Sequence, residues 1–151
     1  MITAIAIVFT TFFAMEGVAW LTHKYVMHGF LWHLHRDHHQ KDATRFLEKN
    51  DYFFLIFALP GILGLLVGVQ QQFSFWFWIG LGITLYGMAY FFVHDVFIHR
   101  RFSFLNNISW PYFKAIRKAH KAHHSNTQQH GGVCFGMLWV PRKFFQNQPT
   151  Q

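Results

Sequence analysis

Three apolar stretches, separated by short polar segments, occupy much of the first two thirds of the chain. The first covers residues 1–22, where Glu16 is the only charged side chain. The other two, 52–69 and 73–93, contain no Asp, Glu, Lys or Arg and are separated by three glutamines. A helix of about 20 apolar residues is long enough to cross the hydrocarbon core of a bilayer. The pattern predicts an all-α integral membrane protein with about three to four transmembrane helices, and these stretches are three of them.

The charged residues other than Glu16 lie in two segments, one after the first and one after the third predicted span. A tight hairpin of 52–69 and 73–93 leaves and returns on one side, so both polar segments belong to the same face. The positive-inside rule places the face that carries Lys and Arg in the cytoplasm. We therefore expect a single membrane-embedded domain, 1–151, with a cytoplasmic histidine-rich helical cap. The short apolar stretch 131–140 is expected to enter the interface or to pack under this cap.

Two features inside the predicted spans carry structural information. Glu16 is a carboxylate within a spanning helix, which is a candidate functional group by default; a structural carboxylate near the helix end is the alternative. Gly64 and Gly68 have the small-xxx-small spacing that permits a neighbouring helix to pack closely.

Composition supports the membrane assignment and narrows the chemistry. The chain is 52% apolar, 21% aromatic and 13% charged, which is too apolar for an ordinary soluble domain. The net charge of +7 does not indicate nucleic-acid binding, because the basic residues are scattered without a recognisable nucleic-acid-binding motif. Cys134 is the only cysteine, which excludes an intrachain disulfide and a cysteine-based metal site. A bound metal must therefore have nitrogen and oxygen ligands.

The polar segments contain a repeated histidine pattern, His-x4-His followed by His-x2-His-His. In an α-helix, the first and third His of His-x2-His-His lie about 40° apart, with the middle one about 60° away on the other side. Three imidazoles therefore share one broad helical face. The boxes fall within 23–39 and 94–124 and consist of His23, His28, His35, His38 and His39, then His94, His99, His120, His123 and His124.

The two His-x4-His pairs do not fit an α-helix as well. Residues five apart differ by about 140° in direction. Three explanations are open for His23 with His28 and for His94 with His99: a local distortion of the helix, a position at the helix end, or one ligand for each of two metals.

Metal ions account for the whole histidine set. Ten clustered imidazoles would repel one another when charged and lack hydrogen-bond partners when buried. Ten ligands exceed the roughly four to six positions of one first-row metal, so two ions are the economical number. Imidazole binds iron, zinc, copper and nickel, so the ligand type leaves the metal open.

Three classes of metalloprotein compete for this pattern. A bis-histidine haem protein would place its ligands within opposed spans. A metal transporter should have polar groups along a path through the bilayer, and the stretch 52–93 offers no charged residue for one. A dinuclear iron oxygenase or desaturase, which takes an apolar substrate from the membrane, remains.

Five motifs carry a resemblance to a known family. They are HKYVMHG at 23–29, WHLHRDHH at 32–39, GMAYFFVHD at 87–95, KAHKAHH at 118–124 and FGMLWVP at 135–141. The chain resembles the bacterial β-carotene hydroxylases, the carotenoid 3-hydroxylase branch of the fatty acid hydroxylase superfamily. The histidine boxes specify the wider superfamily, and GMAYFFVHD points to the carotenoid branch.

The resemblance implies a non-haem diiron monooxygenase that adds a hydroxyl at C3 of β-ionone rings. β-Carotene would be converted to β-cryptoxanthin and then zeaxanthin, with dioxygen and with electrons from NAD(P)H passed through ferredoxin reductase and ferredoxin. It also implies a multi-pass protein of the bacterial inner membrane whose ten box histidines hold two iron ions. One departure is Val96-Phe97-Ile98, where we expect Gly-Leu-Val; these bulkier side chains affect the fit of the substrate.

Other residues are weaker candidates. Asp37 and Asp95 are candidate hydrogen-bond acceptors for ligand histidines, as well as ordinary surface carboxylates. His33 suits an outer or surface position, and His130 is a candidate extra ligand or a residue on the substrate side. The basic residues that would dock an acidic ferredoxin or contact lipid are Arg36, Arg100, Arg101, Lys118 and Lys121. Candidate walls of a polyene groove, or lipid-facing residues, are Phe53, Phe54, Phe91 and Phe92.

Two alternatives to a carotenoid hydroxylase stay open. One is a membrane hydroxylase or desaturase that acts on fatty acyl or sterol chains. The other is a membrane protein that handles metal without catalysis.

Overall fold

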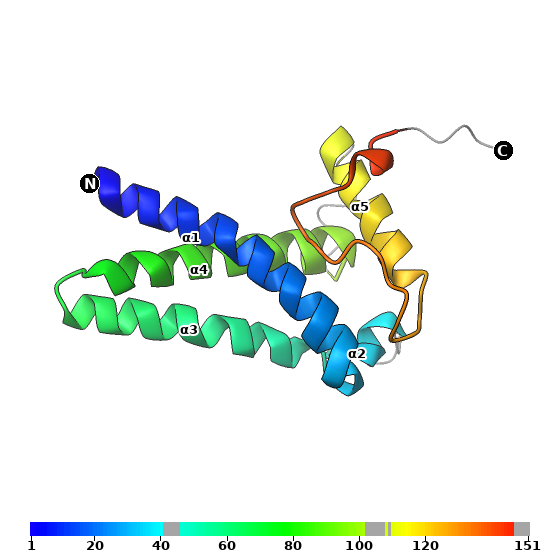
Figure 1. Ribbon diagram of the computed structural model, residues 1–151, viewed down its shortest axis with the longest axis horizontal. Helices are drawn as coiled ribbons and strands as arrows, with labels where there is room; N and C mark the ends of the chain where they lie inside the picture. Colours follow the sequence, from blue (N-terminus) through cyan, green and yellow to red (C-terminus); the bar gives the residue numbers. More distant parts are fainter. Residues whose placement is uncertain (41–45, 102–107, 109, 147–151) are drawn as a thin grey trace.

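The computed structural model describes residues 1–40, 46–101, 108 and 110–146. All regular elements in these ranges are helical, which confirms the predicted class (Figure 1). The α-helices are α1 (Ile2–Leu21), α2 (Trp32–His39), α3 (Asp51–Gln70), α4 (Phe75–Phe91) and α5 (Pro111–His124). Two π-helices, η1 (Thr22–Phe30) and η2 (Phe92–Ile98), continue α1 and α4, and η4 (Arg142–Phe144) is a 3₁₀ turn. The parts of the predicted cap at 41–45, 102–107 and 109 lie outside the described residues.

Three helices are long and apolar enough to cross a membrane: Ile2–Phe30, Asp51–Gln70 and Phe75–Ile98. The three predicted spans are therefore confirmed as helices, but the first and third extend further than predicted. About 20 residues of helix already cover the 30 Å of a hydrocarbon core, because each residue adds about 1.5 Å. The additional turns at η1 and η2 can project past the core as continuations of the spans, with a kink at Gly29 near the end of η1.

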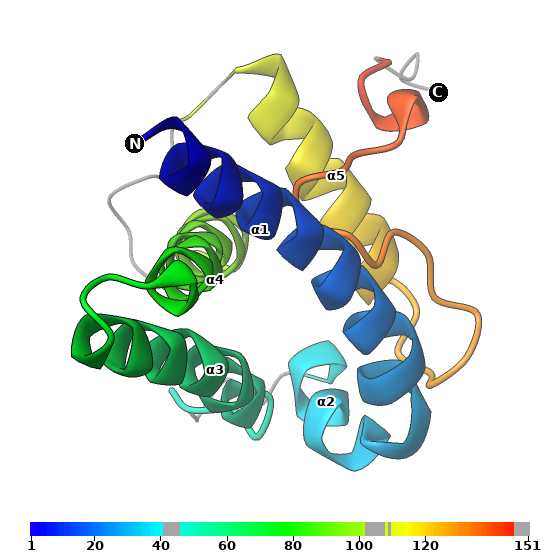
Figure 2. The same cartoon turned by 60° about the vertical axis from the view of Figure 1, so that its left-hand side comes forward.

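The helices form an elongated bundle with a second group of helices at one end. The α3 and α4 helices are antiparallel neighbours, and α1 crosses alongside α4 (Figure 1). The short α2 helix and α5 lie at the end of the bundle opposite the α3–α4 turn (Figure 2). This arrangement brings all four histidine boxes to one end of the molecule.

Glycines permit the close approach of the spanning helices. A Cβ atom placed on Gly64 would lie 2.9 Å from the Cα atom of Gly80, and one on Gly68 would lie 2.3 Å from the backbone nitrogen of Phe77. Real Cβ atoms do not approach backbone atoms so closely, so the backbones of α3 and α4 are in direct contact at these positions. The close packing expected from Gly64 and Gly68 is confirmed.

Glu16 joins the first span to the C-terminal segment. One carboxylate oxygen, Oε1, accepts hydrogen bonds from the backbone N–H groups of Met137, Leu138 and Trp139, at 2.8, 2.8 and 3.0 Å. The other oxygen accepts a hydrogen bond from the Tyr86 hydroxyl at 2.8 Å. These contacts favour the structural interpretation of Glu16. The apolar stretch 131–140 packs against α1 through this carboxylate.

We predict that Glu16→Ala releases the C-terminal segment from α1. Hydrogen bonds to a charged acceptor contribute roughly 1.5–3 kcal/mol each, and the substitution leaves three N–H groups without their acceptor. Trypsin cleavage at Arg142 and Lys143 should accelerate severalfold, as measured by mass spectrometry of the protein in detergent. Gly17→Ala is the matched control, because no atom lies within 4 Å of the new Cβ. Equal cleavage rates in the two variants would contradict the assignment.

Candidate metal centre

The π-helical segment η1 explains the first His-x4-His pair. A π-helix closes i to i+5 hydrogen bonds and so has more residues per turn than an α-helix. At the end of η1, the Leu31 N–H donates to the Val26 carbonyl, five residues back, at 3.0 Å. Residues five apart therefore return to a similar direction, and the His23 and His28 rings lie side by side with centroids 5.3 Å apart.

The second pair is built in the same way. The His99 N–H donates to the His94 carbonyl at 2.9 Å, and the two ring centroids are 4.5 Å apart. Of the three explanations open for His-x4-His, the structure shows the local distortion. Both members of each pair also lie in the same group of histidines, so neither pair is divided between two groups.

Five buried histidines form the first group, which we call the five-histidine group. One ring nitrogen from each lies within 4.8 Å of all the others. The Nε2 atoms that approach each other are 3.1 to 3.3 Å apart. Its members come from η1, α2 and α5: His23, His28, His35, His39 and His123.

Each ring of the five-histidine group donates its Nδ1 proton to an oxygen. Four acceptors are backbone carbonyls, those of Phe135, Gln129, Asn126 and Val133, at 2.7 to 3.0 Å. The fifth is the Asn50 side-chain oxygen, 2.6 Å from His35 Nδ1. Because these oxygens only accept, each Nδ1 carries the proton and each Nε2 carries a lone pair.

Five converging lone pairs fit a metal cation. Without a cation they would face one another at contact distance with no proton between them. Imidazole nitrogens bind a divalent first-row ion at about 2.1 Å, so two ligand nitrogens are about 3.0 Å apart at right angles and about 3.4 Å apart at the tetrahedral angle. The observed Nε2 separations of 3.1 to 3.3 Å lie between these two values.

Four histidines form the second group, the four-histidine group, consisting of His38, His94, His99 and His120. The Nε2 atoms of His38 and His94 are 3.0 Å apart, and those of His99 and His120 are 2.8 Å apart. His38 Nδ1 lies 2.6 Å from Glu48 Oε2, and His94 Nδ1 lies 3.1 Å from Asp95 Oδ2. Two rings of this group thus have carboxylate partners.

Each His-x2-His-His box is divided between the two groups. On α2, His35 and His39 belong to the five-histidine group and His38 belongs to the four-histidine group. Residues 35 and 39 differ by only about 40° in direction, whereas residue 38 lies on the other side of residue 35. On α5, His123 and His120 are divided in the same way. The three imidazoles expected on one face therefore point to two neighbouring positions.

His124 belongs to neither group, although its ring centroid lies 4.7 and 5.0 Å from those of His38 and His99 in the four-histidine group. Its ring stacks on His39, with centroids 4.4 Å apart and planes at 15°, and its centroid is 4.5 Å from that of His120. Its Nε2 atom is buried without a hydrogen-bond partner in the described part of the chain. The structure thus gathers nine predicted ligands into two groups and places the tenth beside both.

The weaker candidates are distributed differently from the box histidines. His33 and His130 are exposed and lie outside both groups. Asp95 contacts a ring as expected, whereas Asp37 accepts a hydrogen bond from the Lys49 N–H at 2.6 Å. Arg101, expected as a surface cation, is largely buried among carboxylates.

Sequence reasoning missed Glu48 and Asn50, the partners of His38 and His35. Both precede α3, ten and fifteen residues from the rings that they contact. Polar residues are common in a segment that precedes a span, so Glu48 and Asn50 do not stand out in the sequence. The only sign of their role is that they lie in the short stretch between a histidine box and the next span.

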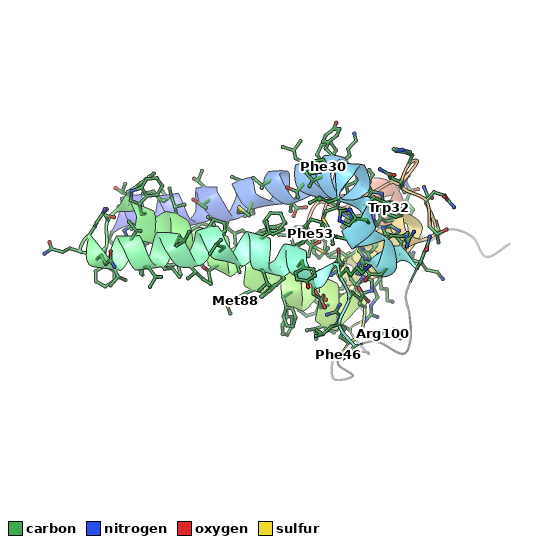
Figure 3. All side chains as sticks on the ribbon, turned by 90° about the horizontal axis from the view of Figure 1, so that it is seen from below. Phe30, Trp32, Phe46, Phe53, Met88 and Arg100 are labelled. Carbon is green, nitrogen blue, oxygen red and sulfur yellow. The ribbon has the colours of Figure 1, made fainter. Side chains whose placement is uncertain are left out.

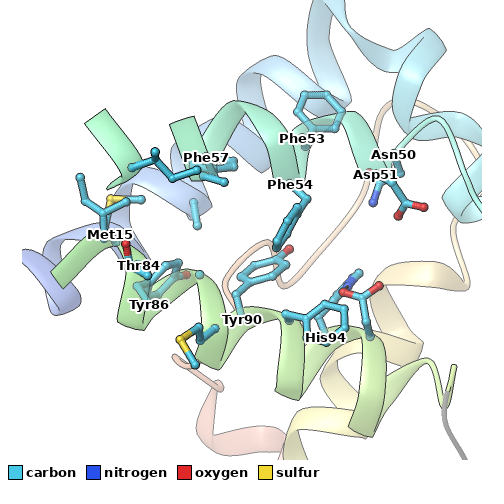
Figure 4. A pocket seen from close by; sticks show the side chains of 18 of the residues that line it. Met15, Asn50, Asp51, Phe53, Phe54, Phe57, Thr84, Tyr86, Tyr90 and His94 are labelled. Atoms are coloured by element: carbon cyan, nitrogen blue, oxygen red, sulfur yellow. Dashed lines mark hydrogen bonds and ion pairs between the residues drawn. The ribbon is translucent and has the colours of Figure 1, made fainter. Parts of the chain in front are cut away.

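An apolar cavity leads to the four-histidine group. It has a volume of about 360 Å³ and lies between α1, α3 and α4. Phe53, Phe54 and Phe91 line it as expected, and Phe92 lies outside it. Phe53 of α3 is labelled in Figure 3, and its ring centroid lies 6.4 Å from that of His35. At this end the lining becomes polar, with Asn50, Asp51, His94 and Asp95 (Figure 4).

Comparison with known proteins assigns the family. The sequence model of the fatty acid hydroxylase family matches residues 8–143. The chain belongs to the fatty acid hydroxylase family. It is 40% identical over 135 residues to the β-carotene hydroxylase of Pantoea ananas, covering 89% of this chain and 76% of that protein.

Two further relatives come from a second bacterium and from a plant. The chain is 36% identical over 140 residues to the β-carotene hydroxylase of Paracoccus sp. (strain PC1), covering 92% of this chain and 85% of that protein. It is also 37% identical over 146 residues to the chloroplastic β-carotene hydroxylase 1 of Capsicum annuum, covering 95% of this chain and 45% of the plant protein. No solved structure gives a significant match.

The box histidines on α2 and α5 of this fatty acid hydroxylase family member are held in the neutral form. Burial is the main cause, and it lowers the pKa of the box rings on α2 and α5, assisted by the charges of neighbouring rings. The pKa is lowered to about 4 for His39, about 3 for His123 and about 2 for His35 and His124, and well below its usual value for His38 and His120. Neutral imidazole is the form that binds a metal.

We predict that the metal-free protein loses stability in acid. An unfolded histidine has a pKa of about 6.5, so below that pH the unfolded chain binds more protons than the folded one. For His39 the stability present above pH 6.5 is lost as the pH falls toward about 4. The melting temperature of chelator-treated protein in detergent should fall by at least several degrees between pH 7.5 and 5. A constant melting temperature over this range would contradict the neutral assignment.

Proposed function

We propose that this chain is a carotenoid hydroxylase that adds a hydroxyl group at C3 of β-ionone rings. β-Carotene would give β-cryptoxanthin and then zeaxanthin. The observation that carries the proposal is the apolar cavity between spanning helices that ends at His94, a member of the four-histidine group. The β-carotene hydroxylase names of the similar proteins support this class of substrate.

Two iron ions are the proposed cofactors. The five-histidine group would hold one ion and the four-histidine group the other, with His124 as the tenth ligand beside both. Non-haem diiron supplies the activation of dioxygen that is required to hydroxylate a C–H bond. Around it, burial would keep the ligand rings of α2 and α5 neutral, and Nδ1 hydrogen bonds would fix the orientation of the rings that make them.

The cavity would hold one end of a long apolar substrate. Its volume of about 360 Å³ is at the small end of the range of about 300–1,000 Å³ for ligand pockets. It suits a ring and the adjoining part of a polyene, while the remainder of the molecule stays in the bilayer. Phe54 of α3 and Tyr90 of α4 lie opposite each other in the cavity (Figure 4). Their flat side chains would orient the ring toward His94.

The remaining assignments concern the location of the protein and its supply of electrons. The chain would be a single domain, 1–151, in the inner membrane of a bacterium. We place its histidine end in the cytoplasm, because the basic residues gather there. Electrons from NAD(P)H would arrive through a ferredoxin reductase and a ferredoxin. Arg36, Arg100, Lys118 and Lys121 are exposed and suit an acidic carrier or lipid headgroups. Arg101 is removed from this set by its burial.

We predict 3-hydroxylated carotenoids when the chain is expressed in bacteria that accumulate β-carotene and supply ferredoxin and its reductase. Pigments are separated by chromatography and identified by mass. His38→Ala should abolish the product at equal protein level, because it removes a ring of the four-histidine group. Absence of product from the unaltered chain, with the protein present in the membrane, would sink the proposal.

The same cells separate the alternatives. Hydroxylated or desaturated acyl chains or sterols without a carotenoid product would indicate the fatty acyl or sterol enzyme. Metal uptake into vesicles without any oxygen-dependent product would indicate a metal-handling protein.

We predict that Gly87→Leu blocks the cavity and reduces the carotenoid product by about tenfold or more. Gly87 lines the cavity, and no atom lies within 4 Å of an added Cβ, so the larger side chain can enter the space without displacing a neighbouring helix. Gly87→Ala is the matched control, because its added methyl group meets no atom within 4 Å and fills little of the cavity. Equal product from both variants would show that the cavity does not receive the substrate.

A further inference from the structure

The two histidine groups differ in the charge of their hydrogen-bond partners. All five rings of the five-histidine group donate from Nδ1 to neutral oxygens, four backbone carbonyls and the Asn50 amide. In the four-histidine group, His38 and His94 pair instead with the carboxylates of Glu48 and Asp95, at 2.6 and 3.1 Å. The groups are neighbours, yet only one of them has carboxylate partners among the described residues.

Arg101 links these carboxylates into one network. Its Nη2 atom lies 2.8 Å from Asp51 Oδ1 and 3.5 Å from Glu48 Oε2, and its Nε atom lies 3.2 Å from Asp95 Oδ1. The other oxygen of Asp95 contacts His94, so one carboxylate joins the guanidinium to the ring. The Arg101 side chain is only 11% exposed. Among the described residues, this network of three carboxylates and one guanidinium sums to a formal charge of −2.

We propose that Glu48 and Asp95 make the two metal positions unequal, the four-histidine position being the one that is strengthened by negative charge. A carboxylate that accepts the Nδ1 proton makes the opposite ring nitrogen a stronger donor to metal, and such partners are typically worth about 10–100-fold in metal affinity. The rings of the five-histidine position have neutral partners instead. Glu48 and Asp95 are positioning residues, because they act through His38 and His94.

The two metal positions also differ in their relation to the substrate cavity. His94 and Asp95 line the polar end of the cavity, and Asp51 of the same network lines it as well. The carboxylate-supported position is therefore the one that faces the cavity. This inference uses the proposed metal-binding role of the two groups and does not depend on the identity of the substrate.

Cobalt(II) titration of the full chain tests the proposal. Chelator-treated protein in detergent is titrated with Co²⁺ at fixed pH against a competing chelator, and binding is followed by visible absorption. His28→Ala and His99→Ala assign the two binding steps to the five-histidine and four-histidine groups. Glu48→Gln and Asp95→Asn should each weaken the four-histidine step by about 10–100-fold and leave the other step unchanged.

Two further variants serve as a gain-of-affinity test and as a control. Asn50→Asp places a carboxylate on His35 and should strengthen the five-histidine step, without removing any contact. Asp37→Asn is the matched control: it removes a carboxylate from α2 that accepts the Lys49 N–H, and both steps should stay unchanged.

Three results would overturn the proposal: equal weakening of both steps by Glu48→Gln, the same loss in Asp37→Asn, or no gain in Asn50→Asp. Because Asn50→Asp adds a charge to an existing hydrogen bond, it decides the matter even where Glu48→Gln does not fold. The outcome is separable from that of the pigment assay. Unequal Co²⁺ steps in a chain that makes no hydroxylated carotenoid would reject the substrate and retain this inference.

Discussion

The centre depends on one constraint: each buried imidazole that turns Nε2 inward needs an oxygen acceptor for its Nδ1 proton. The loop between α5 and η4 supplies much of this requirement, because the carbonyls of Asn126, Gln129, Val133 and Phe135 accept from four rings. Glu16 in turn holds the backbone just beyond these carbonyls against the first span. A carboxylate inside the membrane thus contributes to the orientation of histidines that it does not touch.

The π-helices satisfy a second geometric requirement. A spanning helix that continued as a regular α-helix would direct His28 about 140° away from His23. At the end of the span the hydrogen bonds change to the i→i+5 pattern, so that the same helix directs both rings to one position. A π-helix is rare, so its occurrence at both His-x4-His pairs indicates that its poorer backbone geometry is offset by the interactions that the rings gain. The two histidine groups can then lie next to the membrane, with no loop between the span and its histidines.

Sequence patterns predict much of this architecture, and the rest depends on tertiary packing. Charge-free stretches predict the spans because a bilayer core excludes charge, and the His-x2-His-His spacing predicts clustered rings from the period of a helix alone. The sequence shows a five-residue spacing for His23 and His28, but nothing local says that the helical period itself changes there. The division of His35 from His38, and the pairing of His38 with Glu48, depend on how α2 lies between η1, η2 and the start of α3. Such relations are set by packing and leave no periodic signal.

His94 is the residue at which the apolar cavity, the four-histidine group and the carboxylate network meet. It ends the apolar cavity, its Nε2 atom faces that of His38, and its Nδ1 atom contacts Asp95. The cavity lies between α1, α3 and α4 on the histidine side of the bundle, whereas glycines hold α3 and α4 in contact nearer their connecting turn. Under the proposed function, a ring that enters this cavity would reach His94 of the four-histidine group first. The carboxylates that we propose as the difference between the two positions would then lie on the side from which an apolar substrate arrives.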